Sequence, residues 1–427
     1  MRLRTLIIGM AVSLGLQAGI PAALGGNPAS EDPLRQAGLR QYWEAELPLQ
    51  RGDSVVAVHL LKDTLYVVTR RGDLHAVDPD VGLLRWTHSV ATRGGRVFRP
   101  YHLTTVDGRA AVLVTHGKGA YVYARDSGAV LEEIANMWPA GSAAVGDALS
   151  LYAGGSDGFV YAVRWYDPVH RTPIHTWKVF SGGPVTSRPV LIDTVLHFAS
   201  QSGRVFACSA DWDKDLKWSF STEAAIVADL CGDESGIYVA CLNRSLYRLD
   251  VSSGVLRWRY RFPQPLRDAP IVSQRTVYQH CRGVGLYAID VDTEDAREPL
   301  WILPSATAFV SRRADRTCVL MEDQNIAVVD SATGDVRSTI PMPRGSVVTN
   351  NPNSLTFYVV TAAGQAECFT SADVRHLLAD DILKGLTPPG EAESGDDAEE
   401  RESDAAEDTE DIADVDLDDP LRSRSDR

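Results

Sequence analysis

The chain has 427 residues, of which 44% are hydrophobic and 23% charged, a composition typical of globular proteins with one large domain or two to three ordinary ones. Its net charge is −15, but residues 391–427 hold 17 acidic and 4 basic residues, so the rest of the chain is almost neutral. A nearly neutral body lacks the general basic field that attracts nucleic acid, and we expect no nucleic-acid partner.

The N-terminus has the pattern of a secretory signal peptide. Arg2 and Arg4 precede an uncharged, largely apolar stretch at 5–20, and small residues follow it. This predicts a signal peptide at 1–25 and a linker at 26–40. A retained membrane anchor is the alternative, but the apolar stretch is shorter than the roughly 20 residues that a spanning helix needs. No cysteine lies near the cleavage region, so we expect a protein of the periplasm or cell envelope that is exported and is not a lipoprotein.

A unit of about 40 residues recurs eight times along the chain. Each copy has an apolar run, a turn, a second run rich in Val, Ile and Tyr, a strand such as GLYAID (285–290), and a last strand after a further turn. Four strands in 40 residues form one antiparallel sheet, which is a propeller blade. The sequence therefore predicts an all-β fold, an eight-bladed antiparallel β-propeller over residues 41–377. The equivalent residues of the eight copies follow one another in steps of 48, 38, 45, 41, 40, 40 and 40: Ala76, Ala124, Ala162, Ala207, Arg248, Ala288, Val328 and Cys368.

Two kinds of recurring residue have architectural explanations. In turns such as DVSSG (250–254), the Asp carboxylate can accept backbone N–H groups and the Gly can take a positive φ. Tryptophans recur in the last strand of the copies, where a large ring can pack against the next blade, and we interpret them as structural inter-blade wedges rather than as a ligand cage. These tryptophans are Trp86, Trp177, Trp218, Trp258 and Trp301.

The two ends of the repeat region indicate how the ring closes. The last copy has no outer strand, whereas QYWEAELPL (41–49) resembles an outer strand with nothing before it. We therefore expect the N-terminal strand to complete the eighth blade. Apolar residues at helical spacing predict a short C-terminal helix at 371–386. The acidic tail at 387–427 has few aromatic residues and is expected to be disordered.

The repeat resembles that of the pyrroloquinoline-quinone-type (PQQ-like) β-propellers. GLYAID (285–290), SLYRLDVSSGVLRW (245–258) and GDLHAVDPDVGLLRW (72–86) match its pattern most closely. Two branches share this repeat. One contains the quinoprotein dehydrogenases, which typically carry a vicinal cysteine pair and a calcium site. This sequence has no vicinal cysteine pair, and it shows no compact Glu/Asn/Asp cluster that could form the calcium site. The other contains eight-bladed scaffolds similar to the propeller lipoprotein of the outer-membrane β-barrel assembly machinery, which the size and blade count fit better.

Arginines recur in the loops that enter the innermost strands, which line the central funnel of a propeller. A rim of guanidinium groups would favour an anionic ligand or an acidic peptide, including the acidic tail of this chain. The alternative is a set of scattered surface arginines, because their offsets within the repeat vary. The candidates for this rim are Arg99, Arg188, Arg267, Arg312 and Arg344.

Other residue types give no sign of catalysis or metal binding. The six cysteines form no CxxC pair; Cys241 and Cys281 hold equivalent places in neighbouring copies, so they could approach each other or simply be buried. The ten histidines show no ligand spacing and are interpreted as structural or exposed. Arg248 departs from the alanine that most copies have, which makes the fifth blade a place to look for something particular to this protein.

The sequence as a whole favours a non-enzymatic, exported scaffold. We expect it to bind protein or peptide partners as a monomer, with peripheral association with the cell envelope and no cofactor. The alternative from a different class is a quinoprotein-type oxidoreductase that binds pyrroloquinoline quinone with calcium. Reconstitution with both would discriminate the two.

Overall fold

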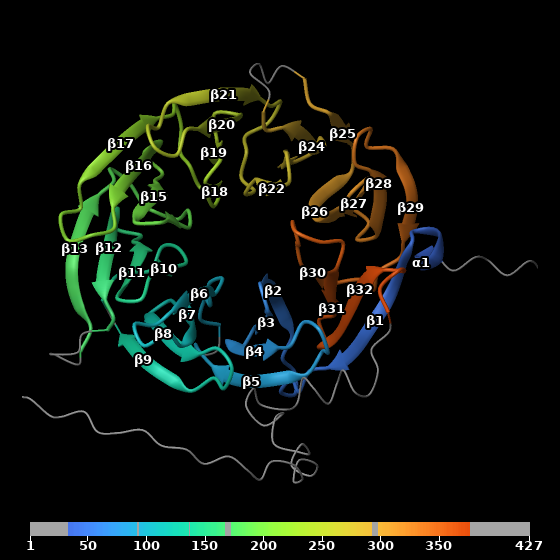
Figure 1. Ribbon diagram of the computed structural model, residues 1–427, viewed down its shortest axis with the longest axis horizontal. Helices are drawn as coiled ribbons and strands as arrows, with labels where there is room; N and C mark the ends of the chain where they lie inside the picture. The colour runs from blue at the N-terminus through green and yellow to red at the C-terminus, as the bar shows by residue number, and fades with distance from the viewer. Residues whose placement is uncertain (1–32, 92–93, 136, 167–171, 293–297, 376–427) are drawn as a thin grey trace, which may run out of the picture. The chain divides into compact units, whose positions relative to one another are not determined.

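The computed structural model of the chain describes residues 33–91, 94–135, 137–166, 172–292 and 298–375. Within these ranges it contains a short helix, α1 (Pro33–Gln36), and 32 strands that form eight four-stranded antiparallel sheets. Figure 1 shows the sheets following one another around a central axis in chain order. The predicted eight-bladed β-propeller is confirmed.

Blades one to four each take four consecutive strands, from the axis outwards (Figure 1). Short polar turns join the strands, as the alternation of β-rich runs with Gly- and Asp-containing segments predicts. The strands are β2 (Val55–Leu61), β3 (Thr64–Thr69), β4 (Asp73–Val77) and β5 (Leu84–Ser89); β6 (Tyr101–Thr104), β7 (Ala110–His116), β8 (Gly119–Ala124) and β9 (Val130–Ala135); β10 (Val145–Gly146), β11 (Ser150–Gly154), β12 (Phe159–Arg164) and β13 (Ile174–Phe180); and β14 (Val190–Ile192), β15 (Val195–Ala199), β16 (Arg204–Ser209) and β17 (Leu216–Ser221).

Blades five to seven continue in the same way, and the eighth differs in its outer strand. The strands are β18 (Cys231–Asp233), β19 (Gly236–Cys241), β20 (Ser245–Leu249) and β21 (Leu256–Arg261); β22 (Ile271–Ser273), β23 (Thr276–Cys281), β24 (Gly285–Asp290) and β25 (Trp301–Leu303); β26 (Ala306–Arg313), β27 (Arg316–Met321), β28 (Ile326–Asp330) and β29 (Val336–Ile340); and, in blade eight, β30 (Val347–Val348), β31 (Phe357–Val360), β32 (Gln365–Ser371) and β1 (Leu39–Glu46).

The ring closes through the N-terminal strand, as expected. Strand β1 is the outer strand of blade eight and pairs antiparallel with β32, from Leu39 opposite Ser371 to Glu46 opposite Gln365. It begins two residues before the expected boundary, and α1 lies just ahead of it in the expected linker. Closure thus brings residues from the two ends of the described chain into one sheet.

The predicted C-terminal helix falls almost wholly outside the described residues. Of residues 371–386, the structure describes 371–375, where Ser371 ends β32 and a turn follows. The signal peptide at 1–25 and the acidic tail at 387–427 also lie outside the described ranges.

The hydrophobic core is divided among the junctions between blades. Each of eight clusters of buried side chains draws its members from two consecutive blades, including the junction between blades eight and one. A single blade cannot bury both of its faces, so packing each sheet against two neighbours removes the apolar surface of all eight from water. This arrangement fixes where each blade directs its inner loops and turns.

Candidate functional site

Two of the five arginines predicted to form an anionic-ligand rim lie within electrostatic range of each other. Arg99 precedes β6 in blade two and Arg188 precedes β14 in blade four. Burial, and after it the charge of Arg188, lowers the pKa of Arg99 to about 10. Burial, followed by the charges of both arginines, lowers the pKa of His59 in β2 of blade one to about 3. Because blade four is a neighbour of neither blade one nor blade two, these three side chains can interact only near the axis.

The three side chains are largely surrounded by protein without being completely buried. Burial is the largest cause of the pKa shift at His59 and at Arg99. Even so, His59, Arg99 and Arg188 all keep part of their surface accessible to solvent. A charged side chain that is mostly surrounded by protein lies in a low local dielectric, and one that keeps some solvent-accessible surface can still be reached by a ligand. A charged group on a small solute would therefore interact with them more strongly than with arginines on the outer surface.

Blade five adds an acid and a thiol to this central cluster. The Asp229 carboxylate accepts the backbone N–H of Arg188 at 2.9 Å. The charge of Asp229 also partly offsets the effects that lower the pKa of Arg99. Burial raises the pKa of the Cys231 thiol in β18, which keeps it neutral. With His59 and Cys231 neutral, two guanidinium groups and one carboxylate leave the central cluster with one positive charge.

The other three arginines do not join this pair through any interaction of the described residues. Arg312, in β26, donates to the Thr276 hydroxyl at 2.6 Å and to the Tyr278 hydroxyl at 3.1 Å. Arg267 and Arg344 are exposed. The structure therefore brings together two of the five arginines.

Sequence reasoning missed His59 and Asp229. His59 lies within an apolar strand, VVAVHLL, and was interpreted with the other histidines as structural or exposed. Nothing in its spacing could have revealed its neighbours, because the groups near it come from blades two and four. An alignment of the repeats could have suggested Asp229, because it occupies the same place in blade five as Arg188 does in blade four. Each of the two residues stands two positions before the innermost strand of its blade begins.

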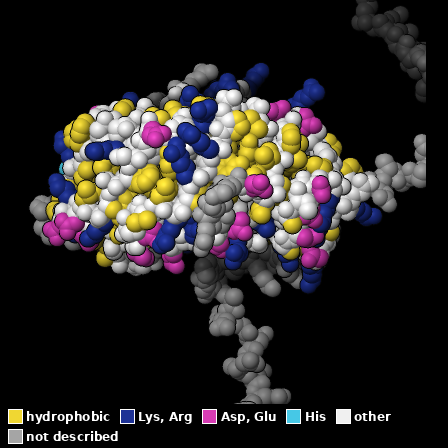
Figure 2. Space-filling view, turned by 90° about the horizontal axis from the view of Figure 1, so that it is seen from above, with side chains coloured by type: hydrophobic (Ala, Val, Ile, Leu, Met, Phe, Trp, Pro, Cys, Tyr) yellow, Lys and Arg dark blue, Asp and Glu magenta, His cyan; other side chains and the backbone are white. Residues whose placement is uncertain are grey.

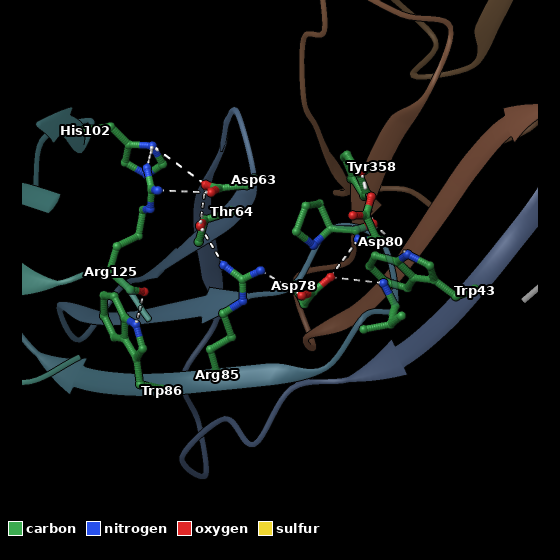
Figure 3. Close-up of polar contacts among 12 residues, drawn as sticks. Trp43, Asp63, Thr64, Asp78, Asp80, Arg85, Trp86, His102, Arg125 and Tyr358 are labelled. Carbon is green, nitrogen blue, oxygen red and sulfur yellow. Dashed lines mark hydrogen bonds and ion pairs between the residues drawn. The ribbon is translucent and has the colours of Figure 1, made fainter. Parts of the chain in front are cut away.

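The five predicted tryptophans all lie at junctions between blades. Each buried ring donates its indole N–H to a backbone carbonyl of the next blade: Trp86 to Arg125 at 2.9 Å, Trp177 to Asp211 at 3.0 Å, Trp218 to Val251 at 2.8 Å, Trp258 to Val291 at 3.0 Å and Trp301 to Ser331 at 3.0 Å. A sixth, Trp43 in β1, donates to Pro79 in blade one at 2.9 Å. Figure 3 shows the bonds of Trp43 and Trp86. The same device thus continues across the point of closure.

Small residues of the repeat make room for these rings. The recurring alanine stands directly opposite the tryptophan in the adjacent strand, as Ala207 does opposite Trp218, and so lies on the same face of the sheet. The turn glycine of the next blade packs on the other side of the ring. Gly254 has φ +68°, and a Cβ added there would lie 2.5 Å from ring carbons of Trp218. The turn glycine therefore satisfies two demands, backbone conformation and close approach.

Arg248, the departure from alanine in blade five, reinforces a junction. It stands opposite Trp258 in the neighbouring strand. Its guanidinium donates to the carbonyl of Val291, which also accepts the Trp258 N–H, and to the carbonyl of Ser235 at 2.9 Å. Its ion-pair partner Asp292 lies 3.8 Å away. These contacts join blade five to blade six and explain the substitution without a ligand.

A polar network joins blades one and two near the turns between their strands (Figure 3). His102 Nε2 lies 2.9 Å from the Tyr66 hydroxyl, and His102 Nδ1 accepts a hydrogen bond from Arg125 at 3.2 Å. Arg125 also forms an ion pair with Asp63 at 3.2 Å. Because arginine only donates, Nδ1 carries no proton in this arrangement and His102 is neutral. Burial, and next the charge of Arg125, lowers the pKa of His102 to about 4.

A pocket of about 340 Å³ lies between α1 and blade seven. Two of the arginines that line it, Arg316 and Arg337, are already paired. Arg337 bonds to Asp315 and Asp330, while Arg316 donates to the carbonyls of Ala37 and Gly38. These contacts fasten the N-terminal segment to blade seven.

The described residues show no site for a metal ion. Within the described ranges, no group of three His, Cys, Asp or Glu side chains could hold one. All six cysteines are thiols, five of them buried, and Cys241 is not bonded to Cys281. No helix in the same part of the chain is long and apolar enough to cross a membrane.

Comparison with protein families places the chain. The family model described as "Outer membrane protein assembly factor BamB" matches residues 36–240 and 201–383, which together include all eight blades. The chain belongs to this family. No curated protein matches the sequence.

Solved structures agree with this at the level of the fold. BamB from Moraxella catarrhalis is 13% identical, with a TM-score of 0.60 over 79% of this chain and 99% of that one. The computationally designed Ika8 protein is 15% identical, with a TM-score of 0.59 over 76% of this chain and 98% of that one. At such low sequence identity, these two structural similarities support the propeller fold alone.

Proposed function

We propose that this member of the BamB family is an exported, non-enzymatic scaffold that binds protein or peptide partners in the assembly of outer-membrane proteins. The observation that carries the proposal is the family match across residues 36–383. The proposal includes removal of the signal peptide at 1–25, a periplasmic or envelope location and action as a monomer without a quinone cofactor.

The outer surface supports a binding role. Each sheet ends in an outer strand with one free edge, and several of these strands expose apolar side chains. Figure 2 shows one edge of the ring, where hydrophobic side chains lie in separate groups among charged ones. Among the described residues, the most exposed aromatic side chains are Phe180, 62% exposed, and Trp212, 60% exposed. Aromatic residues on a surface are the anchors that protein interfaces most often use.

The test is capture of the full chain from an envelope fraction after crosslinking. We expect components of an outer-membrane assembly machinery to be enriched, and enrichment to fall when Phe180→Ser and Trp212→Ser are combined. The matched control is Val106→Ser, which removes an exposed aliphatic side chain instead. Absence of any specific envelope partner would contradict the proposal. Stoichiometric binding of pyrroloquinoline quinone with calcium, together with dye reduction, would replace it with the quinoprotein alternative.

A further inference from the structure

The guanidinium groups of Arg99 and Arg188 have no hydrogen-bond or ion-pair partner among the described residues. The Nε atoms of Arg99 and Arg188 are fully enclosed and make no hydrogen bond. Neither guanidinium forms an ion pair or a hydrogen bond with any residue that the structure describes. By contrast, Arg85 bonds to Asp78 at 2.7 Å and Arg282 to Asp268 at 2.6 Å.

The Asp229 carboxylate, whose charge acts on Arg99, already accepts a hydrogen bond. One oxygen of Asp229 accepts the backbone N–H of Arg188, and the carboxylate forms no ion pair with either guanidinium of the described pair. Holding two partly buried like charges without partners is unfavourable unless something of opposite charge completes the arrangement. Guanidinium groups present several N–H donors in a plane, which suits an oxyanion that can accept from both at once.

We propose that Arg99 and Arg188 form an oxyanion-binding site at the centre of the ring, which takes a phosphate or a carboxylate group. His59 forms its neutral wall, and Asp229 limits the net charge of the central cluster to that of one monovalent anion. Burial raises the pKa of Tyr101 and the charge of Arg188 partly offsets this rise, so Tyr101 lies within electrostatic range of Arg188. This inference does not depend on the scaffold function.

Two sources could supply such a group, a free ion or the carboxylates of the acidic segment 391–427 of this chain. All eight sheets lie between Leu39 and Ser371, so a chain that ends at 390 retains every strand of the ring. Phosphate and glutarate are titrated into both forms by calorimetry at low salt. Binding to both forms indicates a free ion, and binding that appears or tightens only after removal of 391–427 indicates that the tail competes for the site. Either result supports the site.

Variants locate the binding. Arg99→Gln and Arg188→Gln should each weaken phosphate binding roughly 10- to 100-fold, because each removes a charge-assisted donor. Arg267→Gln, which removes an exposed arginine, is the matched control and should bind like the parent. If a Gln variant fails to fold, Arg99→Lys keeps the charge but loses the planar donor pair, and should still weaken binding.

A second readout reports from within the site. A bound anion offsets the two guanidinium charges, so the pKa of His59 should rise on addition of phosphate, as followed by NMR of the imidazole ring. The proposal is overturned if neither form of the chain binds phosphate or glutarate. It is equally overturned if the Arg99 and Arg188 variants bind as tightly as the parent, or if His59 does not respond to the ion.

Discussion

At the junctions between blades, each of the six tryptophans that join one blade to the next donates its N–H to a carbonyl of that blade. At the centre of the ring, the Nε–H groups of Arg99 and Arg188 donate to nothing that the structure describes. The junctions are built from residue types that recur in the repeat, and the centre from residues that differ between copies. The recurring tryptophans thus join the blades, whereas the two central arginines keep hydrogen-bond donors without an acceptor.

The test with the largest expected effect removes the indole of a tryptophan that lies between two blades. Trp218→Ala should lower the free energy of unfolding by about 3–5 kcal/mol, because it leaves a cavity between blades four and five and an unpaired carbonyl at Val251. Urea unfolding measures the change. Trp212→Ala, at an exposed turn position, should change stability by less than about 0.5 kcal/mol. Equal effects at the two positions would contradict the role of the junction ring.

The second test fills the space beside the same ring. Gly254→Ala should destabilise by about 2–4 kcal/mol, since it adds a Cβ 2.5 Å from Trp218 to the strain of a positive φ. Gly283 also has a positive φ, +74°, but nothing lies within 4 Å of an added Cβ. Gly283→Ala should therefore cost only about 1–2 kcal/mol. The difference between the two variants isolates the packing of glycine against tryptophan.

A third test uses pH on the network of His102. Its pKa in the folded chain is about 4, below the ordinary value of 6.5, so the unfolded chain binds more protons between these pH values. The stabilising contribution is complete above pH 6.5 and is lost as pH falls to about 4, at up to roughly 1.4 kcal/mol per pH unit. His102→Gln, which can still accept from Arg125, should lose stability less steeply in this window. The groups that act on His102 are Arg125, Asp63, Lys62 and Arg85. Parallel curves for parent and variant would show that another group is responsible.

The smallest expected effect lies at the centre. Arg99→Gln removes one of two like charges, so stability should stay the same or rise by no more than about 1 kcal/mol. The pKa of His59 should rise from about 3 but remain below 6.5, because burial is the larger cause of its depression. Chemical denaturation and NMR of the imidazole measure the two quantities. A loss of stability comparable with that of Trp218→Ala would erase the contrast between centre and junction.

The fold was predictable because local signals repeat. Eight similar strand patterns at nearly constant spacing, and a lone outer strand at 41–49, were enough to derive both the ring and its closure. The role of Trp43 was harder to see because its copy is split between the two ends of the chain. Arg248 drew attention as a departure from the repeat, yet only the structure shows that it bonds across to Val291.

The central cluster was predictable only in part. The residue type pointed to Arg99 and Arg188, since arginines before inner strands face the funnel. Which of the five would meet depends on distances across the ring between blades that are not neighbours. His59 gave no local signal, because its importance comes from the two charges that reach it from other blades. Sequence patterns describe neighbours along a strand or across a hairpin. They carry no information about which residues of non-neighbouring blades come close to one another.

Closure by β1 also has a consequence for how the chain comes to be assembled. The first strand of the described residues pairs with the last of them, so Leu39 has no sheet to join until Ser371 has been made. Until then it remains an unpaired edge that another chain could capture, and the final pairing must close a loop of more than three hundred residues. We therefore expect ring closure to be the slow, late event of folding, completed only after the last blade emerges.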